Sequence, residues 1–215
     1  VSPLHVRDSH YVKHDVPVTL LIVLAYLAYS RLWGDPKTRN VAIAAAVTGL
    51  AFSTHYYAIF LAIPLAWSAA RGARGTPDAL KRIAIAAIVS AVVFFVCSPF
   101  ILAEPATALR DVQANRQIVV DRAVTSLGYG ATLARYAAML VRDTVGWPFV
   151  LCAAIGLGLL ARHQPRRAAW LLAFSVPFFL FVPSTFPASR YLIPLVPFVA
   201  VLAGVALERV WRWNR

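Results

Sequence analysis

The sequence predicts an all-α protein: a polytopic transmembrane helical bundle of about seven spans, with an interfacial helical loop on its outer face. Of the 215 residues, 60% are hydrophobic and 14% are charged, whereas soluble domains are about half apolar and about a quarter charged. The apolar residues also gather into uncharged stretches that make up more than half of the chain. One soluble core of this size does not need so much apolar helix, so we expect a membrane protein.

The uncharged stretches give the expected spans in order. They are residues 17–30, 41–54, 57–70, 83–103, 144–160, 168–189 and 191–207. Asp15 and Pro17 suit the first turn of the first helix, as a capping acid and an early proline. The second and third stretches each cover only about 21 Å of a hydrocarbon core of about 30 Å. We therefore expect two short helices that meet at residues 53–57.

The fourth stretch is long enough to span the membrane and leads into the longest polar segment, residues 104–143. Within this segment, Ala106–Arg122 has helix-compatible apolar spacing, and Tyr129–Asp143 is amphipathic. We expect helices that lie in the membrane interface rather than a soluble loop. The last three spans are separated by polar turns at residues 163–165 and 186–190.

The basic residues alternate between the two sides of the expected bundle. If the N-terminal segment faces outside, the inner segments hold 13 Lys and Arg against three acids, and the outer segments hold 8 against six. This is the positive-inside pattern. The net charge of +12 therefore comes mainly from basic residues on the expected inner side of the membrane. It does not indicate a nucleic-acid partner.

The organisation of the chain is expected to be a single transmembrane domain over residues 1–215. The only methionine is Met139, and residues 1–16 are polar. We therefore expect the chain to be the C-terminal part of a longer protein, cut on its N-terminal side.

Unusual polar residues converge on the expected outer side, where ionisable groups at membrane depth are costly and usually functional. The candidates before the first span are Asp8, His10, Lys13, His14 and Asp15. His55 and Tyr56 lie at the junction of the short helices, and Arg190 and Tyr191 open the last span. We predict that Asp15, His55 and Arg190 line one pocket just above the lipid tails.

Each candidate also has a purely structural interpretation. Asp15 suits either a ligand or an N-cap. His10 and His14 share a helix face and, with Asp15, suit a divalent metal, or they are exposed interfacial histidines. Lys13 pairs with Asp8 or Asp15, binds a phosphate, or is a solvated charge. Arg190 has no acid nearby in sequence, so its guanidinium either binds a phosphate or reaches to the lipid headgroups.

Four segments in order resemble motifs of the GT-C glycosyltransferases, in particular the protein mannosyltransferase and aminoarabinose transferase-like branch (glycosyltransferase family 39-like). They are residues 8–17 (DSHYVKHDVP), 49–56 (GLAFSTHY), 98–100 (SPF) and 190–197 (RYLIPLVP). The first resembles the second acidic motif of that family. The second segment resembles the family's junction between two helices. The third resembles the residues that end the span before the large outer loop, and the fourth resembles the family's RYLLPLLP-type segment.

The resemblance implies an inverting hexosyltransferase in a bacterial or archaeal plasma membrane, with its site facing outside. The donor would be a polyprenyl-phosphate-linked sugar, and the acceptor a hydroxyl of a glycan, lipid or protein. Asp15 and Asp8 would be catalytic, while Arg190, Lys13, Tyr191, His55 and Tyr56 would bind the donor phosphate. A divalent metal on His14 and His10 is a candidate cofactor. Membrane lipids are the remaining expected partners.

The family's leading catalytic acid lies in an earlier loop that this sequence does not contain, so we expect the chain alone to be inactive. Two other functions stay open. A transporter or lipid flippase would explain the pair of short helices. A non-catalytic lipid-binding subunit would explain the hydropathy but not the clustered polar residues.

Overall fold

A computed structural model describes residues 14–117, 128–185 and 188–213. Within those ranges every regular element is helical, which confirms the predicted all-α polytopic fold. Two compact units can be separated: unit 1 comprises residues 1–16 and 119–215, and unit 2 comprises residues 17–118. The expectation of one transmembrane domain concerns the whole chain and stays a prediction.

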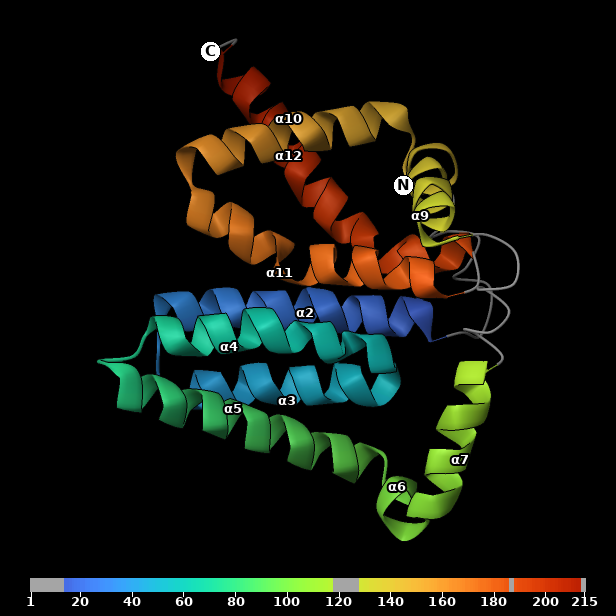
Figure 1. Ribbon diagram of the computed structural model, residues 1–215. Helices are drawn as coiled ribbons and strands as arrows, with labels where there is room; N and C mark the ends of the chain where they lie inside the picture. Colours follow the sequence, from blue (N-terminus) through green and yellow to red (C-terminus); the bar gives the residue numbers. More distant parts are fainter. Residues whose placement is uncertain (1–13, 118–127, 186–187, 214–215) are drawn as a thin grey trace. The chain divides into compact units, whose positions relative to one another are not determined.

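Unit 2 is built from the first helices of the described chain (Figure 1). They are α2 (Asp15–Gly34), α3 (Thr38–Thr54), the 3₁₀ helix η1 (Tyr56–Leu61), α4 (Ala62–Arg71), α5 (Thr76–Cys97), α6 (Phe100–Ala103) and α7 (Pro105–Arg116). The helix α2 begins in unit 1 and enters unit 2 at Pro17. Both α3 and α4 pack against α5.

Hydrogen bonds from side-chain hydroxyls join the helices of unit 2. The Tyr29 hydroxyl lies 2.6 Å from Thr48 Oγ1 on α3. The Ser90 hydroxyl donates to the carbonyl of Ala45 at 2.9 Å, where Gly49 lets α3 approach α5 closely. Such contacts between small residues replace the hydrophobic effect as a cause of helix association in lipid.

Unit 1 contains the remaining elements. They are α9 (Tyr129–Met139), the π-helical turn η3 (Leu140–Thr144), α10 (Trp147–His163), α11 (Pro165–Phe181), the 3₁₀ turns η4 (Val182–Ser184) and η5 (Ser189–Leu195), and α12 (Val196–Trp213). The helices α10 and α12 cross in direct contact (Figure 1). Phe174 and Phe178 of α11 stack on each other, and Phe198 of α12 stacks on Phe174.

Proline and glycine mark several helix starts. A proline occupies the first turn of α5, α7, α10 and α11, where its missing N–H costs no helical hydrogen bond. Gly75 and Gly146, at the starts of α5 and α10, have φ values of 152° and 82°. A side chain at either position would strain the backbone.

In the part of the chain that the structure describes, the helices long enough to cross a membrane are fewer than the seven spans predicted. Among the described residues, four helices are long and apolar enough to cross a membrane, and a fifth span results if α9–η3 and α10, bent by 112°, are taken together. The expected short pair is α3 and η1–α4, which meet at His55 as predicted. The amphipathic Tyr129–Asp143 segment corresponds to α9 and η3. The predicted helix over Ala106–Arg122 is α7 as far as Arg116, and residues 118–127 lie outside the described ranges.

Candidate functional site

The segment that carries Arg190 is fixed by its own apolar residues. In η5, Leu192 and Ile193 are fully buried, and Pro194 is buried as well. Arg190 and Tyr191 precede these anchors and are only partly buried. The RYLIPLVP motif therefore places two polar side chains at the edge of a rigid, buried turn.

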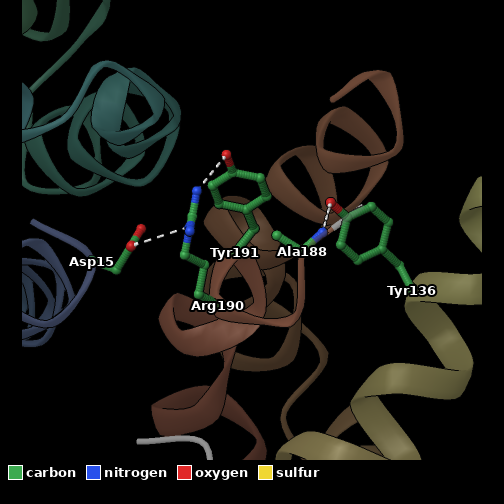
Figure 2. A network of polar contacts seen from close by, with 5 residues as sticks. All are labelled: Asp15, Tyr136, Ala188, Arg190 and Tyr191. Carbon is green, nitrogen blue, oxygen red and sulfur yellow. Dashed lines mark hydrogen bonds and ion pairs between the residues drawn. The ribbon is translucent and has the colours of Figure 1, made fainter. Parts of the chain in front are cut away.

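Asp15 and Arg190 form an ion pair within unit 1 (Figure 2). The Nε atom of Arg190 lies 4.0 Å from Oδ2 of Asp15; the carboxylate side chain is 3% exposed and the guanidinium side chain 37%. Because a buried carboxylate is poorly hydrated, its attraction for the guanidinium is larger than on an open surface. The exposed part of the guanidinium is accessible to an anion.

Tyr191 contacts the same guanidinium from the next position in the chain. Nη2 of Arg190 donates to the Tyr191 hydroxyl at 3.4 Å, and the guanidinium carbon lies 5.1 Å from the centre of the Tyr191 ring. Figure 2 shows Arg190 between Asp15 and Tyr191. Two neighbours therefore orient the cation, and a fixed guanidinium loses less entropy when it binds a phosphate.

Tyr136 contacts the segment that precedes Arg190, although the sequence did not single it out as a site residue. It lies on α9, is fully buried, and its hydroxyl accepts a hydrogen bond from the backbone N–H of Ala188 at 3.2 Å. Ala188 lies two residues before Arg190, so this bond holds the start of η5 against α9 (Figure 2). The sequence showed Tyr136 only as part of an amphipathic face.

His55 and Tyr56 belong to unit 2, where they form the junction between α3 and η1. His55 is buried, and its Nδ1 accepts from the backbone N–H of Tyr57 at 3.4 Å. The His55 ring lies 4.5 Å from that of Tyr56, which is 49% exposed. Of the predicted pocket residues, Asp15 and Arg190 are thus brought together, whereas the participation of His55 stays a prediction.

The other predicted site residues lie at the N-terminus. Asp8, His10 and Lys13 fall outside the described residues. His14 is exposed and directly precedes Asp15, so the two offer a nitrogen and an oxygen donor side by side. Imidazole and carboxylate suit a transition metal such as zinc. The metal on His10 and His14 stays a prediction.

Comparison with known proteins agrees with the resemblance of the motifs. Residues 1–102 match the family model described as dolichyl-phosphate-mannose-protein mannosyltransferase. The matched region includes Asp15, His55 and Tyr56 and ends before Arg190. No curated protein and no solved structure matches the chain significantly.

Proposed function

We propose that this chain, which resembles the GT-C glycosyltransferases over residues 1–102 and has apolar helices long enough to cross a membrane, forms part of an inverting enzyme that transfers a sugar from a polyprenyl-phosphate donor to an acceptor hydroxyl. The observation that carries the proposal is the ion pair between Asp15, inside the matched region, and Arg190, in the RYLIPLVP motif far outside it. The transfer would take place on the less basic side of the membrane, which we assign to the non-cytoplasmic face.

Arg190 binds the donor phosphate in this proposal. When the acceptor oxygen attacks the anomeric carbon, the bond from that carbon to the phosphate oxygen breaks and the lipid phosphate leaves with one more negative charge. A guanidinium fixed in advance stabilises the developing charge, because it need not reorganise during the reaction. Its partial exposure of 37% leaves room for the phosphate.

Asp15 has two roles in the proposal. Its carboxylate orients Arg190, and as the second acid of its motif it helps to place the acceptor or a divalent metal. The acceptor proton goes to a carboxylate acting as general base. Asp8 is a second catalytic candidate, and Lys13, Tyr191, His55 and Tyr56 are candidates for further contacts to the donor phosphate. A metal held by His14 and His10 would supply additional charge stabilisation.

The test is sugar transfer by the complete gene product that contains this chain. Membranes are supplied with a labelled polyprenyl-phosphate sugar and an acceptor extract, and the labelled product is measured. Arg190→Ala is expected to lower transfer by about 10²–10³-fold, as the loss of one preorganised donor does elsewhere. Arg190→Lys keeps the charge but not the planar fork, so we expect an intermediate loss.

The matched control is Arg135→Ala, an exposed arginine on α9 in the same unit, which should transfer like the wild type. Asp15→Asn should lower transfer because the guanidinium loses its buried counter-charge. Unchanged transfer in both Arg190→Ala and Asp15→Asn would remove the site assignment. Movement of a lipid across the membrane without any transfer product would instead favour the transporter or flippase.

A further inference from the structure

A second candidate site lies in unit 2, away from the residues assigned above. A cavity of about 470 Å³ lies between α3, η1, α4 and α5. It exists because small side chains line it where larger ones would fill it, among them Gly49, Ala66 and Ala87. Ala87 is exposed, so the cavity is a groove that opens at the surface.

The wall of the groove is apolar in its chemistry. Its two hydroxyl-bearing residues, Thr48 and Ser90, donate to the carbonyls of Ala44 and Ala45 on α3, at 2.8 Å and 2.9 Å. Their donors are therefore used inside the protein. The remaining lining is aliphatic and aromatic, so the groove suits a hydrocarbon ligand.

The length of the groove matches one leaflet of a bilayer. Along α5 it extends from Ile83 to Phe95, which corresponds to about 18 Å at the helical rise of about 1.5 Å per residue. Half of a hydrocarbon core is about 15 Å. One acyl chain of a single leaflet therefore fills the groove, whereas a polyprenyl chain is much longer than it.

The end of the groove at Ile83 adjoins a strongly basic turn. Between Arg71 and Arg82 the chain has four basic residues and one acid, Asp78. That acid already accepts a hydrogen bond from the backbone N–H of Arg74. The guanidinium of Arg71 stacks over the indole of Trp33 at 4.0 Å, and tryptophan is typical of the membrane interface.

Arg82 lies where the basic turn meets the groove. It directly precedes Ile83, and its Nε donates to the carbonyl of Ala69 on α4 at 2.7 Å. Its Nη2 is buried and has no hydrogen-bond acceptor in the part of the chain that the structure describes. The basic end therefore holds positive charge that its own acid does not neutralise, and an anion there is favoured.

We propose that the groove binds one acyl chain of an anionic phospholipid, with the phosphate of that lipid at the basic turn between Arg71 and Arg82. The proposal goes beyond the glycosyltransferase function, because it uses none of the residues assigned to donor or acceptor. The negative headgroup meets the unneutralised cations while the chain covers the apolar wall.

The test uses the purified full chain in nanodiscs made from phosphatidylglycerol or from phosphatidylcholine with the same acyl chains. Native mass spectrometry should find one retained phosphatidylglycerol per chain and at least fivefold less phosphatidylcholine. Ala87→Phe, which fills the groove, should lower retention at least fivefold. Ala84→Phe is the matched control, because Ala84 is exposed on the same helix and does not line the groove.

A second pair of variants tests the headgroup without altering the groove. Replacing both Arg71 and Lys81 by Gln should abolish the preference for phosphatidylglycerol, whereas replacing both Arg166 and Arg167, in another basic turn, should not. Equal retention of both lipids by the wild type would overturn the proposal, as would normal retention by Ala87→Phe. Displacement of phosphatidylglycerol by polyprenyl phosphate would assign the groove to the donor tail, and a co-purified protein segment in it would assign it to a partner.

Discussion

Replacing Gly156 by Ala tests the contact between α10 and α12 most directly. A Cβ atom at residue 156 would overlap the carbonyl oxygen of Leu202 and would lie 2.8 Å from the Leu202 carbonyl carbon and 3.2 Å from the backbone nitrogen of Ala206. All of these neighbours are backbone atoms, so no side-chain rotation relieves the overlap. One of the two helices must move.

The expected magnitude follows from two opposing effects. Alanine stabilises a helix by up to about 1 kcal/mol relative to glycine. Overpacking of a close contact costs about 1–3 kcal/mol, and in lipid the lost packing is not replaced by a hydrophobic force between helices. We expect Gly156→Ala to lower the free energy of unfolding by about 1–2 kcal/mol. Each kcal/mol corresponds to a fall of about 2–4 °C in the unfolding midpoint of a chain of this size.

The same helices supply the controls. At Gly158 on α10 and Gly204 on α12, an added Cβ would point into open space. Their alanine variants should be as stable as the wild type or more stable. The assay is thermal unfolding of the purified chain in one detergent, followed by tryptophan fluorescence. If Gly156→Ala unfolds at the same temperature as Gly158→Ala, the close approach of α10 and α12 is refuted.

Two further predictions concern buried hydroxyl groups. Tyr29→Phe should lower the free energy of unfolding by about 0.6–1.5 kcal/mol, because the hydrogen bond to Thr48 is lost. A double-mutant cycle with Thr48→Val measures the coupling energy between the two side chains. A coupling energy of zero would contradict the prediction. Tyr136→Phe removes the acceptor for the Ala188 N–H and should weaken donor binding severalfold, seen as a higher KM. The control is Tyr129→Phe, which removes the hydrogen bond from the Tyr129 hydroxyl to the exposed backbone carbonyl of Leu180. It should leave the KM unchanged.

Much of the helix pattern could be predicted from the sequence, because hydropathy acts locally. The described part of each apolar stretch is largely helical, and two short helices meet at His55 within the predicted junction. The stretch over residues 83–103 is not one helix, because α5 ends at Cys97 and α6 begins at Phe100. The number of helices long enough to cross a membrane could not be predicted correctly from the sequence. Length alone does not show where a helix bends, and the 112° bend between α9–η3 and α10 depends on Gly146 and on how the neighbouring elements pack.

The residues of the candidate site also differ in whether the local sequence predicts them. Arg190 can be predicted from the sequence because a charge beside an apolar stretch is costly unless it has a function, and Asp15 can be predicted because it lies two residues before a proline. Tyr136 cannot be predicted in this way, since its hydroxyl contacts the backbone N–H of Ala188, 52 residues away in the sequence. Gly156 carried no sequence signal either, because a close helix crossing depends on its partner as much as on the glycine.

The sequence by itself therefore determined that this chain is helical and membrane-spanning, since burial in lipid depends on the composition of each segment, and its motifs pointed to the transferase family. Only the tertiary structure decided which distant side chains meet. Asp15 and Arg190 are far apart in the sequence but form an ion pair, and buried apolar residues of η5 fix the segment that carries Arg190. Such a contact depends on packing across the whole unit, which no local pattern encodes.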